Sequence, residues 1–422
     1  MEASRHFVDM LRQFSPAVEQ YSIDEAWVDM TGTERLWGSP RLAAEKMRQR
    51  IWEELGFTVN VGISSNKLLA KMAGDFEKPN KVHTLFPEEM EKKFFPLPVR
   101  DLFLVGAAIV LGVVGLVAFH DHLNMDAIKR SRLRIAFDPM YGVSHGSLRT
   151  ILMTCRCDVD VIHENHDTLF GGRMPAPDEE ALKYLAGYVP DNGCALGIAT
   201  DGDADRLGVI DENGRYLHAN TLVVLLYYYL LKYKGWRGDC VRNNSTTHLL
   251  DRVAASFGQK CHEVPVGFKH ISAKMAQTGA IIGGESSGGM AVKGHIPGKD
   301  GIYAAALLVE MLAVTGKSVS ELYREIVETY GELSYEEASL KFDPARRAAL
   351  KKTVYEDRAT PDFGREAERI TFGDGCKVVF RDGSWVICRF SGTEPLLRIA
   401  AEAPTTSQAK DFIAGWKEFL RI

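Results

Sequence analysis

Hydrophobic positions in residues 124–330 fall into short strand-like runs that alternate with segments of helical spacing. The runs predict strands at Ile135–Asp138, Val159–His163, Leu196–Thr200, Cys240–Asn243, Lys260–Val264 and Ala280–Gly283, and a hairpin from Val209–Asp211 to Tyr216. Helices are predicted to start at Ser147–Met153 and to cover Glu179–Tyr188, Asn220–Tyr233, His248–Phe257, Ile271–Gln277 and Gly301–Thr315. This alternation favours mixed sheets covered on both faces, with ligand loops at the carboxyl ends of strands.

The last part of the chain has a different pattern. Residues 334–369 are highly charged, and residues 370–422 suggest strands followed by a final helix, which together predict an α+β unit. A length of 422 residues allows three or four domains with real cores. The predicted fold class is therefore a multidomain α/β protein: two α/β domains, a C-terminal α+β domain and a preceding N-terminal part.

Composition narrows the cellular setting. The net charge of −5 gives no overall basic footprint for nucleic acid. The seven cysteines are scattered and odd in number, which indicates reduced thiols. Residues 1–10 carry charges throughout and show no signal-peptide core, so a cytoplasmic protein is predicted.

The segment 201–206, Asp-Gly-Asp-Ala-Asp-Arg, follows an apolar run. Asp201, Asp203 and Asp205 alternate with small residues, so their carboxylates can point into one small space. Oxygen-only ligands of this kind suit Mg²⁺, and Arg206 offers a planar fork to a phosphate bound beside the metal. Taken alone, a solvated acidic turn explains the segment equally well.

Three further segments carry complementary chemistry, and the shortest, 267–270, places Lys269 and a histidine beside a glycine turn. Residues 283–289, Gly-Gly-Glu-Ser-Ser-Gly-Gly, combine a carboxylate and hydroxyls, which can bind sugar hydroxyls, with glycines that allow close approach. Residues 389–398 place two arginines around a Ser-Gly-Thr turn, as a phosphate cradle would. The resulting candidate sugar and phosphate ligands are Lys269, Glu285, Ser287, Arg389, Ser391, Gly392, Thr393 and Arg398. His295 and Lys299 are secondary candidates, because a solvated Gly/Pro loop accounts for them equally well.

These loops resemble, in order and separation, the metal, sugar and phosphate loops of the α-D-phosphohexomutases, the phosphoglucomutase/phosphomannomutase family. The resemblance covers about 124–422, roughly 70% of the chain. It implies the family's second domain at 124–235, its third at 236–333 and its fourth at 334–422. It also implies Mg²⁺ as cofactor and phosphotransfer between the 1- and 6-positions of glucose or mannose phosphates.

The family's first domain carries a phosphorylated serine in a loop of the type Thr-Ala-Ser-His-Asn-Pro. This sequence contains no such loop. Its nearest imitation, Ser144 within Val143-Ser-His-Gly146, is interpreted as a turn residue. The resemblance therefore implies impaired or absent turnover, and no catalytic residue is assigned.

The N-terminal part has motifs of its own. Residues 22–26, Ser-Ile-Asp-Glu-Ala, lie in a strand-like run, and residues 59–73 suggest a strand that enters a helix. Over residues 1–103 they resemble part of the palm of Y-family DNA polymerases, the lesion-bypass type of DNA polymerase IV. The resemblance implies Asp24 and Glu25 as Mg²⁺ ligands, and Lys67 and Lys71 beside a nucleotide or the DNA backbone. The fingers and little finger are missing, so primer extension is not expected.

Residues 104–123 connect the two parts. The stretch 102–119 has eighteen uncharged residues, the threshold length for a membrane span. Gly106, Gly112 and Gly115 instead resemble the helix–hairpin–helix that starts the Y-family thumb, which favours a buried connector and no membrane.

Two partial families in one chain indicate a natural fusion, a rearranged gene or an assembly artefact. The first functional hypothesis is a phosphohexomutase-derived protein. The alternatives are a non-catalytic binder of sugar phosphate and Mg²⁺, and a DNA-binding fragment of a lesion-bypass polymerase.

Overall fold

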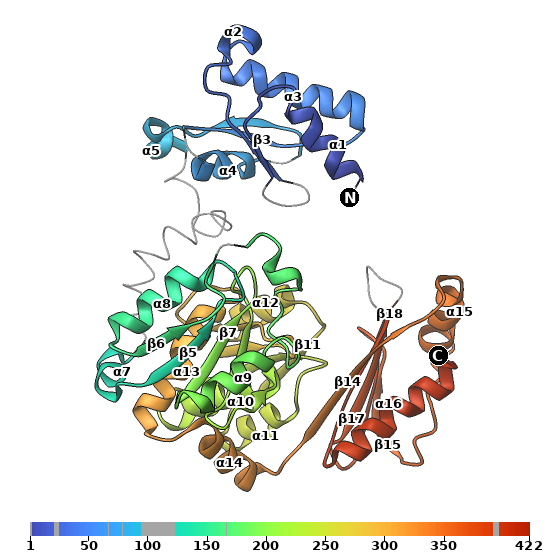
Figure 1. The fold of residues 1–422 in the computed structure, drawn as a ribbon. Helices are drawn as coiled ribbons and strands as arrows, with labels where there is room; N and C mark the ends of the chain where they lie inside the picture. The colour runs from blue at the N-terminus through green and yellow to red at the C-terminus, as the bar shows by residue number, and fades with distance from the viewer. Residues whose placement is uncertain are drawn as a thin grey trace. The chain divides into compact units, whose positions relative to one another are not determined.

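The computed structural model describes residues 2–20, 25–65, 67–77, 79–93, 123–165, 167–390 and 396–422. The chain divides into two compact units, Met1–Gly115 and Leu116–Ile422 (Figure 1). Asp24, Ser391, Gly392, Thr393 and nearly all of the connector 104–123 lie outside the described residues, so the predictions made for them stay predictions.

The N-terminal unit is a small α+β body. Its helices are α1 (Glu2–Leu11), α2 (Glu34–Trp37), α3 (Pro40–Leu55), α4 (Lys67–Asp75) and α5 (Met90–Lys93). Strands β1 (Val18–Gln20) and β2 (Ala26–Val28) pair antiparallel, and β3 (Val61–Ile63) and β4 (Val82–Thr84) pair parallel. Gly62 is required where α4 crosses β3, because a Cβ there would lie 1.8 Å from the carbonyl oxygen of Ala70. The strand predicted to enter a helix is thus present.

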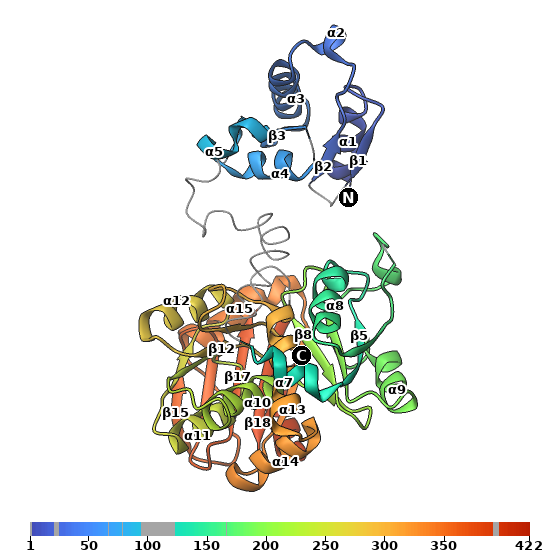
Figure 2. The ribbon, with the colours of Figure 1, turned by 90° about the vertical axis from the view of Figure 1, so that its left-hand side faces the viewer.

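The first sheet of the second unit has the strand order β6-β5-β7-β8-β9. Its strands are β5 (Arg134–Asp138), β6 (Asp158–Val161), β7 (Leu196–Thr200), β8 (Leu207–Ile210) and β9 (Tyr216–Leu217), and its helices are α7 (Met125–Ser131), α8 (Ser144–Thr154) and α9 (Lys183–Asp191). Strands β5 to β7 are parallel, and β8 and β9 run antiparallel. Helices α8 and α9 flank this sheet (Figure 2). Alternate strand residues face opposite sides: Phe137 belongs to the same buried cluster as Leu148 of α8, and Ala136 to the same cluster as Leu185 of α9.

The second sheet has the order β11-β10-β12-β13. Its strands are β10 (Cys240–Asn243), β11 (Cys261–Val264), β12 (Ile282–Gly284) and β13 (Met290–Val292). The accompanying helices are α10 (Ala219–Lys232), α11 (Leu249–Ser256), α12 (Phe268–Thr278), α13 (Gly301–Thr315) and α14 (Val319–Tyr330). Helices α10 and α13 are almost wholly buried, and one continuous hydrophobic core joins them to both sheets.

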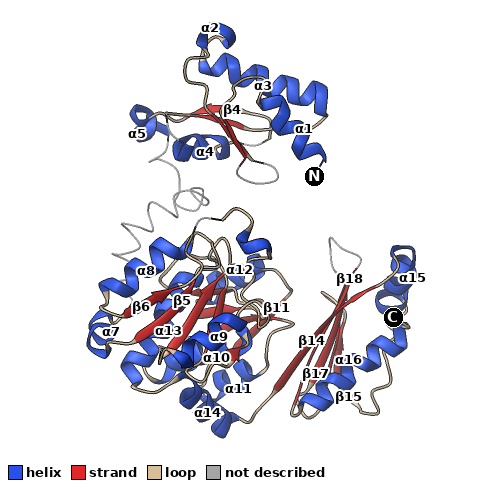
Figure 3. Ribbon diagram, in the orientation of Figure 1, coloured by secondary structure: helices blue, strands red, loops and turns tan. Residues whose placement is uncertain are grey.

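The third sheet is antiparallel, in the order β14-β18-β17-β16-β15 (red in Figure 3). Its strands are β14 (Ser334–Lys341), β15 (Ala367–Thr371), β16 (Cys376–Phe380), β17 (Trp385–Phe390) and β18 (Leu396–Ala403). Helices α15 (Arg347–Lys351) and α16 (Thr406–Leu420) accompany it, with a π-helical turn at Lys352–Glu356. The second unit therefore has two α/β domains followed by an α+β domain, as predicted.

Buried charges attach this last sheet to the second one. The Lys377 ammonium donates hydrogen bonds to Glu263 Oε2 (2.6 Å) and His248 Nε2 (3.0 Å). Arg242 donates to the same Glu263 oxygen at 2.7 Å, and the backbone N–H of His248 donates to Glu402 at 2.8 Å. Two cations share one carboxylate. Burial raises the pKa of Glu263, but the neighbouring His248, Lys377 and Arg242 side chains outweigh it, so that the pKa is lowered overall.

Three local predictions need correction. Helix α8 begins at Ser144 rather than at Ser147, and α9 begins at Lys183 rather than at Glu179. The charged stretch 334–369 contains β14, in which exposed and half-buried residues alternate, so charged side chains can occupy its open face.

Among the described residues, no single helix is long and apolar enough to cross a membrane. Helices α13 and α14 reach the required length and composition only as a pair, which is bent by 82° at its break.

Candidate metal centre and neighbouring loops

The acidic segment 201–206 turns directly out of β7, all of whose residues are buried. Asp201, Asp203 and Asp205 each offer a carboxylate oxygen, and these three atoms lie within 4.8 Å of one another. The backbone N–H of Arg206 donates to Asp201 Oδ1 at 2.9 Å, and Ala204 has a left-handed backbone with φ of 64°. The tight turn therefore converges the three carboxylates, as the sequence predicts.

The charge of this triad fits a small, hard cation. Burial raises the pKa of Asp201 to about 7, and the carboxylates of Asp203 and Asp205 add to the rise. Three oxygen donors at this spacing, without sulfur or imidazole, are the ligand type that Mg²⁺ prefers. The residues present thus fit the metal that the family resemblance implies.

Two side-chain cations stand beside the triad. The Lys299 ammonium lies 2.6 Å from Asp205 Oδ2, so Lys299 belongs to the acidic site and not to a solvated loop. Arg206 Nε lies 3.5 Å from Asp201 Oδ2 and 3.8 Å from Asp205 Oδ1, and this buried atom has no hydrogen-bond partner among the described residues. Both cations are placed to exchange carboxylate contacts for a bound anion.

The sugar-type loop 283–289 is tied to the acidic turn by backbone contacts. Arg206 and Gly289 form a β-bridge, and Leu207 N–H donates to the Gly288 carbonyl at 3.2 Å. Within the loop, Ser287 Oγ donates to Glu285 Oε1 at 2.8 Å. A Cβ at Gly289 would lie 2.4 Å from Lys299 Cδ, so the Lys299 side chain passes close to the loop backbone.

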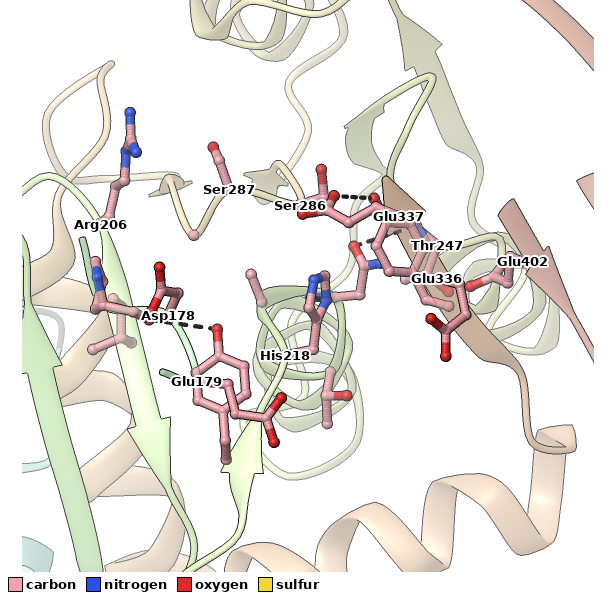
Figure 4. A pocket seen from close by; sticks show the side chains of 18 of the residues that line it. Asp178, Glu179, Arg206, His218, Thr247, Ser286, Ser287, Glu336, Glu337 and Glu402 are labelled. Carbon is pink, nitrogen blue, oxygen red and sulfur yellow. Dashed lines mark hydrogen bonds between the residues drawn. The ribbon is translucent and has the colours of Figure 1, made fainter. Parts of the chain in front are cut away.

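A cavity of about 600 Å³ opens beside the sugar-type loop (Figure 4). Of the sequence-predicted ligands, Arg206 and Ser287 line it. Its other charged lining is acidic: Asp178, Glu179, Glu336, Glu337 and Glu402. In Figure 4 the first two carboxylates and the last three lie on opposite sides of His218. Such a lining suits hydroxyl groups and repels phosphate.

The arginines predicted to hold a phosphate lie at the ends of β17 and β18. Arg389 and Arg398 are direct register partners. Arg389 is half-buried and Arg398 exposed, and no ion pair joins either to another described residue. Residues 391–395 between these strands are not described.

The remaining sugar-site candidates are placed differently. Lys269 is exposed in the first turn of α12. His295, a secondary candidate, is not solvated: its side chain is only 5% exposed, its Nε2 lies 2.6 Å from Asp300 Oδ2, and its ring stacks on Tyr303. Asp300 also caps α13, so His295 supports the start of that helix.

Ser144 is the first residue of α8 and is fully buried, so its interpretation as a turn residue is wrong. Its Oγ lies 2.6 Å from Thr200 Oγ1. Thr200 immediately precedes Asp201, so the Ser144 hydroxyl supports the strand end that leads into the triad.

The described polymerase-like candidates of the first unit all form ion pairs. Lys71 forms an ion pair with Glu25, and Lys67 with Glu19. The predicted metal ligand Glu25 is thus neutralised by a lysine. Both lysines predicted to contact nucleotide or DNA have a carboxylate partner.

Sequence reasoning missed Asp138 and His163, a pair next to the acidic turn. His163 Nδ1 lies 2.9 Å from Asp138 Oδ2, and Asp138 is 1% exposed. The position of Asp138 at the end of a buried strand could have marked it as a candidate. Nothing in the sequence around His163, 25 residues later, indicates that the two side chains meet.

Family models match most of the chain. Residues 116–214 match "Phosphoglucomutase/phosphomannomutase, alpha/beta/alpha domain II", residues 218–330 match domain III and residues 337–415 match the C-terminal domain. Residues 1–75 match the impB/mucB/samB family.

Individual relatives agree with this division. A phosphoglucomutase/phosphomannomutase of Thermococcus kodakarensis is 31% identical over 296 residues, which are 70% of this chain and 62% of the relative. DNA polymerase IV of Clostridium acetobutylicum is 47% identical over 108 residues, 26% of this chain and 27% of the relative. The chain thus spans less than two thirds of either relative.

A solved structure shows the same fold. A phosphoglucomutase/phosphomannomutase family protein from Burkholderia thailandensis superposes with a TM-score of 0.59 at 23% identity, covering 72% of this chain and 64% of its own. Together with the family models and the shared loops, these likenesses settle the lineage of the larger unit. Residues 116–415 belong to the phosphoglucomutase/phosphomannomutase family, of which they hold the second, third and fourth domains, and they follow a segment similar to DNA polymerase IV.

Proposed function

We propose that the second unit binds a hexose phosphate, glucose or mannose 1- or 6-phosphate, together with Mg²⁺. The main support is that carboxylate oxygens of Asp201, Asp203 and Asp205 lie within 4.8 Å of one another, beside a sugar-type loop. The Arg206–Gly289 bridge fixes the distance between the two. A bound metal would polarise a phosphoryl oxygen.

The proposed division of labour follows the side-chain chemistry. Glu285 and Ser287, already hydrogen-bonded to each other, exchange that bond for sugar hydroxyls. Arg389 and Arg398, with residues 391–393 between them, take the phosphate. Lys269 at the start of α12 contributes a further positive charge. The unit's proposed subdivision is 124–235, 236–333 and 334–422, one loop from each.

We further propose that this chain interconverts the two phosphate positions slowly or not at all. Its lineage performs intramolecular phosphotransfer through a phosphoserine, and the present sequence has no loop of that type. Ser144 does not substitute for it, because its hydroxyl is buried and bonded to Thr200. The chain is then a sugar-phosphate and Mg²⁺ binder of mutase descent.

Calorimetry tests the binding proposal. The full chain is titrated with glucose 1-phosphate in Mg²⁺ and again in EDTA, alongside Asp203→Ala, with exposed Asp191→Ala as the control. Heat that depends on Mg²⁺ and on Asp203 but not on Asp191 is expected. Equal affinity in all four experiments rejects the metal-assisted site.

Turnover is measured separately by coupling glucose 6-phosphate formation to NADP reduction. The expected signal lies at the level of the Asp203→Ala variant. Robust conversion by the wild type alone rejects the inactive-binder proposal and leaves the binding site standing.

The likeness to DNA polymerase IV favours a second function, DNA binding by the first unit. Lys67 and Lys71 would release their carboxylate partners to phosphates of the DNA backbone. Fluorescence anisotropy with a primer–template duplex tests this: Lys67→Ala and Lys71→Ala should weaken binding, and exposed Lys92→Ala should not. Identical curves for all variants reject it.

A further inference from the structure

Four residues around one turn share a rarely occupied backbone. Met140, Tyr141 and His163 have φ of 49°, 61° and 50°, and Phe170 has φ of 51°. L-residues seldom adopt this left-handed conformation, and it persists where surrounding contacts hold it. The turn 139–143 lies at the carboxyl end of β5, next to the strand that leads into the acidic triad.

Asp138 and His163 hold this turn through hydrogen bonds. Asp138 Oδ1 accepts a hydrogen bond from Met140 N–H at 2.8 Å, and Asp138 Oδ2 lies 2.9 Å from His163 Nδ1. The Tyr141 N–H donates to the His163 carbonyl at 3.0 Å, and the two rings lie 5.1 Å apart. The Asp138 carboxylate thus holds Met140, while the backbone carbonyl of His163 and its ring hold Tyr141.

The turn 139–143 also supports the acidic segment 201–206. Val143 N–H donates to the Gly202 carbonyl at 3.1 Å. Gly142 packs so closely that a Cβ would lie 2.8 Å from the Gly202 oxygen and 2.9 Å from the Asp201 oxygen. The backbone that carries the first carboxylate of the triad therefore rests on residues 142–143.

We infer that Asp138 and His163 are positioning residues for the Asp201–Asp205 metal site, acting through the turn 139–143. The inference rests on the proposed metal binding and extends it to two residues that offer no ligand to the triad. The bond from His163 Nδ1 is the key element, because it orients the Asp138 carboxylate. Outer partners of this kind typically change metal affinity by about 10- to 100-fold.

The side chain of His163 can be replaced so that the bond is kept or lost. The Asn amide reaches the position of Nδ1, and Asn tolerates left-handed backbone well. The Gln amide lies one carbon further out and misses Asp138. His163→Asn and His163→Gln therefore compare two neutral amides. His262→Ala serves as control: His262 is 23% exposed, close to the 22% of His163, and it pairs with Asp239 at the amino ends of β10 and β11.

Binding of Mn²⁺, a paramagnetic substitute for Mg²⁺, is measured by EPR on the full chain at a temperature where circular dichroism shows every variant folded. Wild type, His163→Asn and His262→Ala should bind alike, and His163→Gln about tenfold more weakly. Equal affinity in His163→Gln, or an equal loss in His163→Asn, overturns the inference. A wild type that binds no Mn²⁺ instead refutes the metal proposal.

Hydrogen–deuterium exchange over residues 199–206 supplies a readout that needs no metal. Faster exchange in His163→Gln than in His163→Asn is expected, since only the former frees the turn. Indistinguishable exchange in these two variants overturns the positioning role, whether or not Mn²⁺ binds.

Discussion

Arg389 and Arg398 stand directly opposite each other across β17 and β18, so their two side chains lie on the same face of the last sheet. Side chains of directly opposed residues lie on the same face of an antiparallel pair, and like charges in this relation destabilise the sheet. A bound phosphate would turn the repulsion into two attractive contacts. The pairing thus gives the phosphate proposal support that the loop motif alone did not.

Removing either arginine should weaken sugar-phosphate binding. Arg389→Ala or Arg398→Ala loses one charge-assisted contact of about 1.5–3 kcal/mol, roughly a 10- to 100-fold drop in glucose 1-phosphate affinity. Arg381→Ala, whose side chain is 72% exposed and pairs with Glu366, should change nothing. Calorimetry that finds the three variants equal to wild type contradicts the cradle.

The same substitutions should act in the opposite direction on the ligand-free protein. Each substitution removes a repulsion between like charges. The free energy of unfolding of Arg398→Ala should therefore be higher by a few tenths of a kcal/mol, which shifts its urea midpoint slightly upward. A loss of stability in Arg398→Ala without ligand would show that the two guanidinium groups do not repel each other in the folded state.

Metal affinity should depend on pH near neutrality. The pKa of Asp201 is raised to about 7 by burial and by the neighbouring carboxylates, so below that pH a proton competes with the metal for this ligand. Mg²⁺ affinity, followed by calorimetry at pH 6, 7 and 8, should rise with pH. In Asp201→Asn the affinity should be lower and nearly flat over this range; an unchanged slope in that variant would place the titrating group elsewhere.

Ser144→Ala should affect folding rather than chemistry. It leaves the buried Thr200 hydroxyl without its partner, which costs about 1 kcal/mol of unfolding free energy. Urea denaturation measures the loss, and the coupled mutase assay should show no difference from wild type. Wild-type mutase activity that disappears in Ser144→Ala would identify Ser144 as the nucleophile and refute its structural role.

Acid should destabilise the second unit through His248. Burial, aided by the Arg242 charge, lowers the pKa of His248 to about 4 from an ordinary 6.5. Between these values the unfolded chain binds the proton and the folded chain does not, so stability falls as pH drops from 6.5 towards 4, by about 3 kcal/mol in all. His248→Gln keeps an acceptor for Lys377 and does not titrate.

Urea denaturation at pH 4.5 and pH 7 measures this term as the difference between wild type and His248→Gln. The wild type should lose more stability on acidification than the variant does. His145→Gln, at an exposed position of α8, provides the control and should follow the wild type. Equal acid sensitivity in wild type and His248→Gln assigns the loss to other groups.

The sequence predicted what is local. Asp201, Asp203 and Asp205 converge because one short turn after a buried strand carries all three. The two α/β layers followed from strand and helix periodicity. The charged β14 was overlooked because glutamates and serines interrupt its few apolar residues, so its alternation is weak in the sequence.

Features that depend on partners distant in sequence escaped prediction. Lys71 was assigned to a nucleotide, yet an ion pair with Glu25 links α4 to residues beside β2. His163 meets Asp138 only because β5 and β6 are parallel neighbours, and the strand order cannot be inferred from one sequence.

The continuous core under α10 and α13 limits how this protein can be divided. Phe137 of the first sheet and Leu226 of α10 belong to the same cluster of buried side chains, although the family models separate them at residues 214 and 218. A gene cut there would leave both fragments with bare apolar surfaces and no independent fold. Recombination can therefore exchange the two α/β domains only together, whichever segment precedes them in the gene.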